Sequence, residues 1–372
     1  YVAENGVTIK ARETAIIGDT QAIDDVEYTV VDETMLREMV ANNEDVTNIV
    51  TSGITNLSGL FNGNQTFNQD ISSWDTSSVT TFSNMFHKAT IFNQDLSNWD
   101  VSNATDFTLM FFDTHNFNSD IANWDVSSGI TFAGMFSGTQ KFNVDISNWD
   151  VSNATNMGGM FSNTLAFNQN IGNWDVSSVT TMADMFHNSV FNQPIEMWDV
   201  SSVVDMSTMF WHSNFNHPLA NWDVSNVTKM NGMFDKASNF NQNINTWDVS
   251  KVVTMESMFA YSVMNYPLDN WDVGNVVNMN GMFAYNQFFN QDLRSWCVTR
   301  FTNPAQGFKD FSILSDGNLP IWGQCGEIYL DDNGVTIKAR DNAVVGESYK
   351  LTNDGDSYKV VDETTLREMV AN

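Results

Sequence analysis

Residues 142–161, with the sequence FNVDISNWDVSNATNMGGMF, are one copy of a motif that recurs along most of the chain. A tryptophan marks each copy and returns every 24 or 25 residues: Trp74, Trp99, Trp124, Trp149, Trp174, Trp198, Trp222, Trp247, Trp271 and Trp296. A fixed period of roughly 20–50 residues is typical of a solenoid, in which each unit buries its apolar face against its neighbours. The sequence therefore predicts a repeat solenoid.

The apolar positions of the motif indicate which side chains face the core. In the quoted copy they are Phe142, Ile146, Trp149, Val151, Met157 and the pair Met160 and Phe161. They stay apolar in the other copies, and a stacked coil has one dry interior. We therefore interpret the Met-Phe columns as core and not as an aromatic binding stripe.

One asparagine column is the same in every full copy. Its members are Asn68, Asn93, Asn118, Asn143, Asn168, Asn192, Asn216, Asn241, Asn265 and Asn290. A buried asparagine at a coil corner can bond backbone groups that a turn leaves unpaired. We predict an inward-facing structural asparagine ladder, with the Phe-Asn-x-Asp segments forming one parallel sheet. An exposed ligand-binding asparagine array is the alternative.

An aspartate follows the tryptophan in nine copies: Asp75, Asp100, Asp125, Asp150, Asp175, Asp199, Asp223, Asp248 and Asp272. Stacked about 4.8 Å apart, exposed carboxylates would repel one another. Either each aspartate accepts backbone N–H bonds in an Asx turn, or the row binds Ca²⁺, which prefers oxygen ligands. The sequence favours the turn as the structural role, and Ca²⁺ is the one cofactor it leaves open.

The charge of the chain excludes several kinds of partner. The formal net charge is −29, from 45 acidic against 16 basic residues, and no arginine lies between Arg37 and Arg294. Nucleic acid and anionic membrane surfaces both need clustered cations, so we expect neither as a partner. No apolar run is long enough to insert in a membrane within this segment. The sequence also carries no catalytic motif, so we do not expect an enzyme.

The chain divides into four parts. Residues 1–45 are predicted to form a small β unit, with strands near 7–10 and 28–31, and a capping helix over 33–41 behind an Asp32 N-cap. Residues 46–311 are the array of about eleven repeats, and residues 312–328 close it. Residues 329–372 duplicate residues 1–42, since 30–42 and 360–372 agree at twelve of thirteen positions. We expect a second helix at 363–371, and a longer parent protein built of tandem blocks, of which this chain is a processed or excised piece.

The two cysteines, Cys297 and Cys325, lie where the array ends. A disulfide between them would close a loop of about 27 residues and add about 3 kcal/mol in the chain-entropy estimate. We predict this bridge, which implies an extracellular compartment. Two buried thiols are the alternative.

The pattern W-D-V-S-N-V-T-x-M-x-x-M-F, together with F-N-Q-D-I, resembles the repeat of the BspA-like leucine-rich-repeat surface proteins of bacteria. The resemblance covers about residues 46–311. It implies a leucine-rich-repeat-like right-handed coil with short parallel strands and short helices or turns, flanked by small β-plus-helix capping units. It also implies secretion, display on the cell surface and cell adhesion.

Two functions from different classes follow. The first is a non-catalytic structural segment of a secreted, extracellular adhesin or surface filament, whose partners are neighbouring tandem blocks and a surface glycan or protein ligand. The second is a carbohydrate- or Ca²⁺-binding surface module, with Trp211, Tyr261 and Tyr266 as candidate exposed aromatic residues. Ice binding is disfavoured, because the outward row that begins Thr80, Thr105 and Ile130 is not uniformly threonine.

Overall fold

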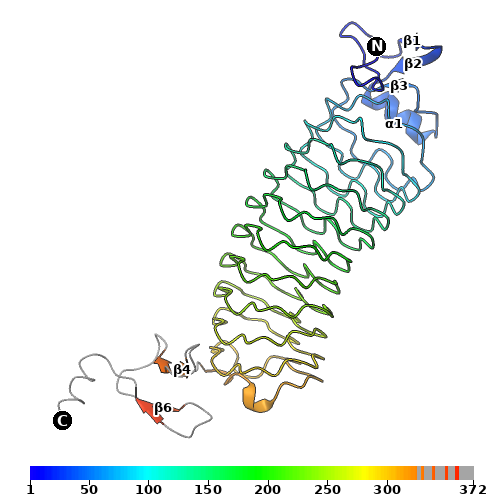
Figure 1. Ribbon diagram of the computed structural model, residues 1–372. Helices are drawn as coiled ribbons and strands as arrows, with labels where there is room; N and C mark the ends of the chain where they lie inside the picture. Colours follow the sequence, from blue (N-terminus) through cyan, green and yellow to red (C-terminus); the bar gives the residue numbers. More distant parts are fainter. Residues whose placement is uncertain (325–327, 331–336, 340–347, 351–356, 360–372) are drawn as a thin grey trace, which may run out of the picture.

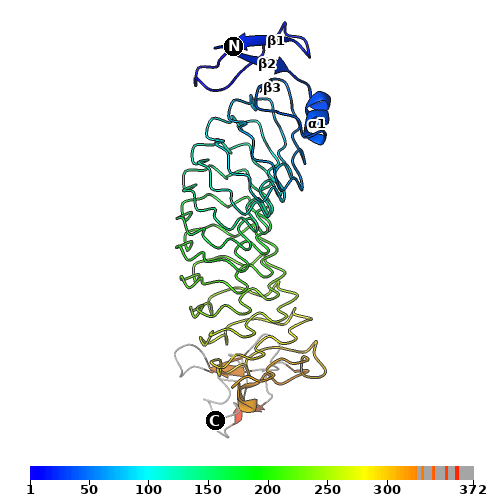
Figure 2. The same cartoon turned by 90° about the vertical axis from the view of Figure 1, so that its right-hand side faces the viewer.

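The computed structural model describes residues 1–324, 328–330, 337–339, 348–350 and 357–359. A long stack of coils follows the N-terminal unit, and its colours run in chain order from one end to the other (Figure 1). The view turned by 90° shows the same narrow, elongated stack (Figure 2). We call residues 46–311 the stack. Among the helices in the described part of the chain, none is long and apolar enough to cross a membrane.

The N-terminal unit begins with a small sheet that continues into the first coil. Strand β1 (Thr20–Ile23) pairs antiparallel with β2 (Val26–Val30), and β2 pairs in parallel with β3 (Ile49–Val50), which belongs to the stack. Residues 7–10 form only an isolated bridge, between Ile9 and Val2. Because β3 lies beside β2, the unit and the stack share one sheet.

Helix α1 (Glu33–Ala41) begins as the sequence predicted. The Asp32 carboxylate accepts a hydrogen bond from the Met35 N–H at 2.8 Å, which satisfies one of the free donors of the first turn. Leu36 is fully buried against the core. The helix therefore covers the apolar end of the stack.

Arg37 on α1 closes the backbone edge of the first coil. Its guanidinium donates to the carbonyl oxygens of Ser58 at 3.1 Å and Asn56 at 3.3 Å. One coil later, the equivalent carbonyls of Ser83 and Thr81 accept N–H bonds from the preceding coil. Arg37 thus replaces the coil that is missing before the first one.

Successive coils are joined by parallel backbone bridges, one residue per coil. These run Asn56, Thr81, Asp106, Thr131, Asn156, Thr181, Asp205, Lys229, Thr254 and Asn278. The prediction that the Phe-Asn-x-Asp segments form the parallel sheet is wrong, since those segments carry no strand or bridge. Their asparagine side chains make the link between coils instead, so the backbones need not pair there.

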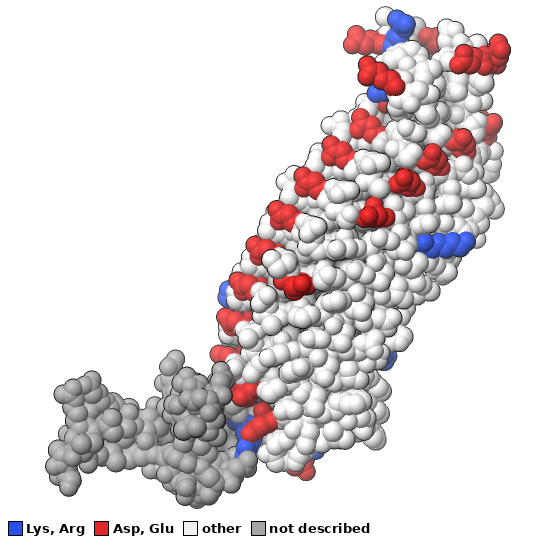
Figure 3. Space-filling view, in the orientation of Figure 1, with Lys and Arg blue, Asp and Glu red and all other residues white. Residues whose placement is uncertain are grey.

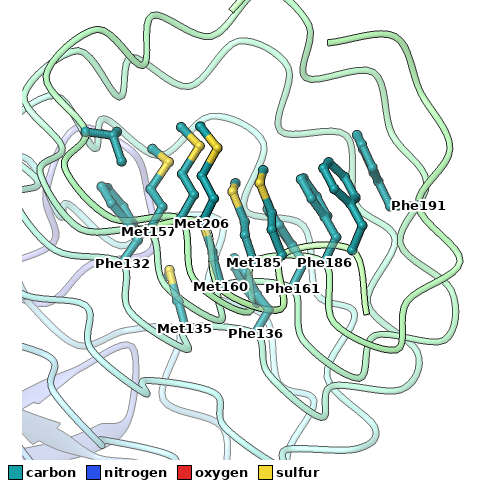
Figure 4. Close-up of a cluster of buried hydrophobic side chains, with 14 of the residues drawn as sticks. Phe132, Met135, Phe136, Met157, Met160, Phe161, Met185, Phe186, Phe191 and Met206 are labelled. Atoms are coloured by element: carbon teal, nitrogen blue, oxygen red, sulfur yellow. The ribbon is translucent and has the colours of Figure 1, made fainter. Parts of the chain in front are cut away.

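The core is continuous from Val31 to Leu314, and the predicted apolar columns are buried in it. Methionine and phenylalanine side chains from successive coils line up, as Met160 and Phe161 do with Met185 and Phe186 (Figure 4). Stacked rings show the regularity: Phe136 and Phe161 have centroids 5.9 Å apart, and equivalent phenylalanines follow on both sides.

The tryptophan column adds a polar link between coils. In every copy the indole Nε1 donates to a main-chain carbonyl of the preceding coil; Trp149, for example, donates to the Ile121 oxygen at 3.1 Å. The indole rings also stack, with Trp124 and Trp149 centroids 6.4 Å apart. The same carbonyl also accepts the backbone N–H of its own coil's tryptophan, as Ile121 does from Trp124 at 3.2 Å. A phenylalanine could fill this space but would lose the bond between coils, which favours tryptophan in this column.

The segment after the bridge forms turns, one of the two forms that the sequence predicted there. Each coil has two residues with positive φ, four apart, such as Gly134 and Gly138 or Thr208 and His212. A left-handed residue ends a helical turn, so the segment cannot continue as a helix. Elsewhere in the stack and its closing segment, the only described helix is the 3-10 helix η1 (Asp316–Asn318).

Residues 312–324 cover the far end of the stack. Trp322 packs edge-on against Phe308 and Phe301, with centroids 5.1 and 5.8 Å away. The N–H of Val298 donates to the Gln324 carbonyl at 3.0 Å. The predicted partner of Cys297, Cys325, lies outside the described residues, so the disulfide stays a prediction.

Part of the duplicated segment pairs as the N-terminal unit does. Strand β4 (Ile328–Leu330) pairs with β5 (Ile337–Ala339), and β6 (Ser348–Lys350) pairs with β7 (Ser357–Lys359), both antiparallel. The pair Leu330 and Ile337 corresponds to Val2 and Ile9, and Tyr349 and Tyr358 correspond to Gln21 and Tyr28. The predicted second helix at 363–371 lies outside the described residues.

Candidate binding surface

The asparagine column lies on the outside of the stack. All ten side chains are exposed, so the prediction that they point inward is wrong. They do form a ladder: each Oδ1 accepts a hydrogen bond from the backbone N–H of the next asparagine, as Asn68 does from Asn93 at 2.9 Å. The last one, Asn290, accepts from Ser315 at 2.8 Å. The asparagine column is therefore invariant because each side chain links its coil to the next one on the surface of the stack.

Three glutamines that directly follow a column asparagine strengthen this ladder. The Gln169 amide donates to both the carbonyl and the Oδ1 of Asn143, at 2.9 and 3.0 Å. Gln242 and Gln291 make the same pair of bonds. The acceptor oxygens of the asparagine column are therefore used inside the protein, as links between coils.

The aspartate column makes Asx turns. The Asp125 Oδ1 accepts bonds from the Ser127 N–H at 3.1 Å and the Ser127 hydroxyl at 2.6 Å, and every other aspartate of the column bonds the N–H two residues on. The serine bonds hold the pKa of Asp125 below its usual value, and those of Asp175 and Asp223 likewise. Of the two roles considered for this column, an Asx turn or a Ca²⁺ site, these contacts are the ones that an Asx turn makes.

Asp75 is the one buried member of the aspartate column. Burial raises the pKa of its carboxyl, but bonds from Ser52 and Ser77 and the charge of Lys10 outweigh burial and lower the pKa overall. Lys10 thereby ties the N-terminal unit to the first coils. In the part of the chain that the structure describes, no three His, Cys, Asp or Glu side chains converge as a metal site would require.

The aromatic candidates Trp211 and Tyr261 belong to stacked rows of rings on the surface. His187 and Trp211 have centroids 4.3 Å apart, and Lys236 Nζ lies 4.6 Å from the centre of the Trp211 ring. Tyr261 stacks on Tyr285 at 4.4 Å, and Tyr285 stacks on Phe311 at 4.7 Å. The structure does not bring Tyr266 into these rows. Since stacked rings cover one another's faces, a ligand can stack only where a row ends.

Two half-buried carboxylates, those of Asp184 and Asp235, accompany the His187 row, and the sequence did not single them out. Asp184 accepts a bond from Thr208 and lies 3.2 Å from His187 Nδ1, while Asp235 accepts from Trp211 Nε1 at 3.0 Å. Burial raises the pKa of the Asp235 carboxyl despite the bond from Trp211. Neither aspartate occupies a position that the repeat motif fixes. Their roles become visible only when the residues of adjacent coils are in place.

The surface charge is arranged in lines. Figure 3 shows rows of acidic side chains along the stack, with few basic ones between them on this face. Ion pairs within the stack are sparse; Lys229 and Asp205 form one at 3.0 Å. Like charges of this density repel other anions.

The stacked coils define a tandem-repeat protein, and comparison with known families gives the particular one. The model of the family described as "Mycoplasma protein of unknown function, DUF285" matches residues 32–147, 128–217 and 211–322. These segments together span most of the chain, so the chain belongs to this family. No curated protein and no solved structure matches it.

Proposed function

We propose that the chain is a non-catalytic structural segment of a secreted cell-surface adhesin or surface filament, which mediates or extends adhesion. The observation that carries the proposal is the uninterrupted stack, in which backbone bridges, asparagine bonds and tryptophan bonds join each coil to the next. We assign its coils to BspA-like leucine-rich repeats, on the repeated W-D-V-S and M-x-x-M-F residues.

The stack suits a spacer because it resists bending and fraying. One core runs its whole length, and both ends are covered, by α1 and Arg37 at the start and by Trp322 at the finish. In a solenoid the stability of each unit depends on its neighbours, so closed ends protect every coil between them. The duplication of residues 1–42 in 329–372 supports neighbouring blocks of the same kind as partners.

Display on the cell surface is testable with antibodies. Fab fragments raised against the whole chain should label intact cells of the organism that produces it and reduce their attachment to a surface. Fab fragments against an unrelated surface protein of the same cells are the control for steric blocking. Labelling that appears only after lysis would contradict the proposal.

A glycan-binding surface is the second candidate, and one specific observation favours it. The rings on the surface are interrupted in the middle of the stack, where a hollow opens between them. A ring face that no other ring covers is what a sugar can stack on, and this place offers one.

A further inference from the structure

A hollow of about 810 Å³ lies on the stack between residues 108 and 188. It is a broad, open groove, and its floor consists of small residues, including Gly134, Gly158 and Gly159. An enclosed cavity would suit a compact small molecule, whereas an open groove along the stack suits a chain-like ligand.

The groove coincides with two consecutive coils in which the residue after the Met-Phe pair is a small, buried serine. In chain order the column at this position reads His87, Phe112, Ser137, Ser162, His187, Trp211, Asp235, Ala260 and Ala284. His87 stacks on Phe112 at 4.9 Å, and His187 stacks on Trp211 at 4.3 Å, so rings are present on both sides of the two serines. The two serines therefore separate two stacked pairs of rings, and the column has no further ring after Trp211.

Phe112 presents one ring face to the gap between these two pairs. Its other face is covered by His87, while the next residue in the column is Ser137, which is too small to cover it. Phe112 is half-buried and lines the groove. A flat apolar face beside open space is a stacking platform for another ring.

Polar groups around the gap both donate and accept. Asn188 donates to the Asn163 Oδ1 at 2.9 Å, and Asn163 donates to the Ser162 hydroxyl at 3.0 Å, so each amide keeps unused bonding positions. Asp113 and Asp184 add carboxylate acceptors. No lysine or arginine is among the residues that line the groove.

We propose that this groove binds a neutral glycan chain, with one sugar ring against Phe112 beside Asp113, and with hydroxyls of the following sugars bonded to Asn163 and Asn188. Hydroxyls donate and accept, which matches amides mixed with carboxylates. Anionic glycans are disfavoured by the carboxylates and by the net charge of −29. This inference rests on the proposed adhesive function and names the class of ligand for it.

The decisive variant fills the gap with rings that the column already tolerates. Ser137→Phe combined with Ser162→Phe should continue the ring row, because Phe112 and Trp211 occupy the same column. Ala260→Phe adds a ring to that column outside the groove and is the matched control. Phe112→Ala removes the platform without filling the groove. All variants are made in the full chain, and their thermal unfolding is compared with that of the original.

The probes are cellotetraose, laminaritetraose, maltotetraose and mannotetraose, titrated by calorimetry and by protein NMR. We expect at least one to bind, with its Kd raised about tenfold or more by the double serine variant and by Phe112→Ala, and unchanged by Ala260→Phe. The proposal is overturned if none of the four binds, if binding survives both groove changes, or if tetralysine occupies the groove and the sugars do not. Attachment of cells that persists in the filled variant would overturn this site alone and leave the adhesin proposal standing.

Discussion

The tryptophan is the residue that the fold depends on most. Its ring fills the core, and its N–H donates to a carbonyl of the preceding coil. Both packing and hydrogen bonding therefore favour tryptophan in every copy of the motif. Aliphatic residues provide the packing only. The same logic explains the asparagine, whose amide reaches the next coil from outside.

Replacing Trp149 with phenylalanine tests the hydrogen bond. The Ile121 carbonyl would lose the indole donor and keep only the Trp124 N–H, so we expect a loss of about 0.5–1.5 kcal/mol in the free energy of unfolding, the value of one hydrogen bond. Urea unfolding followed by hydrogen exchange should show the loss. Val277→Thr, at an exposed position, is the control and should change stability little. An unchanged midpoint for the tryptophan variant would refute this role of the indole N–H.

The aspartate column predicts that the stability of the folded chain depends on pH. Serine bonds lower the pKa of Asp125 in the folded state, so its contribution is present above the unfolded value of 3.8 and is lost as pH falls below it. Asp125→Asn keeps an oxygen acceptor for the turn but does not titrate. Its stability should therefore decline less than that of the original chain between about pH 5 and about pH 3. Parallel decline in both proteins, measured by urea midpoints, would show that the carboxylate does not matter.

At the scale of elements, the backbone groups at the edge of each coil are paired in two different ways. Between coils the edge is paired by neighbouring backbone, whereas at the first coil a single side chain on α1 replaces that neighbour. The carbonyls of Asn56 and Ser58 would otherwise be unpaired beside the helix. An arginine suits this place because its planar head offers several donors in fixed directions.

Arg37→Met should loosen the first coil while leaving the rest of the stack intact. Bonds from a charged donor contribute about 1.5–3 kcal/mol, and both of these would be removed. Hydrogen exchange should increase for amides of residues 49–63 and stay unchanged beyond Trp149. Arg12→Met, which alters an arginine outside the helix, is the control. Equal exchange in the two variants would mean that α1 caps the stack without Arg37.

At the scale of the whole molecule, charge and shape act together. One row of acidic side chains follows most of the stack and a second follows its N-terminal half, so neighbouring coils place carboxylates beside one another (Figure 3). Self-repulsion of this kind keeps proteins apart in solution and also weakens the compact state. Ion pairs in the described residues relieve only part of it.

Salt should therefore stabilise the protein. Raising NaCl from about 0.01 M to about 0.5 M shortens the screening length from about 30 Å to a few Å, which reduces repulsion along the rows. The melting temperature should rise, and sucrose at matched osmolality should not reproduce the dependence on ionic strength. A melting temperature that falls with NaCl would mean that the acidic rows are not a source of strain.

The sequence by itself determined the period, the inward apolar columns, the helix behind Asp32 and the duplication of the first block. A strict repeat makes positions equivalent, and a position that is apolar in every copy has only one dry place to go. Only the tertiary structure decided whether the invariant asparagines face the core or the solvent, where the coils are bridged, and that Phe112 faces a gap. An asparagine satisfies a backbone N–H equally well from inside or from outside, so its invariance carries no direction. Rings in one column stack or separate according to their neighbours in adjacent coils, and that contact exists only once the coils are packed.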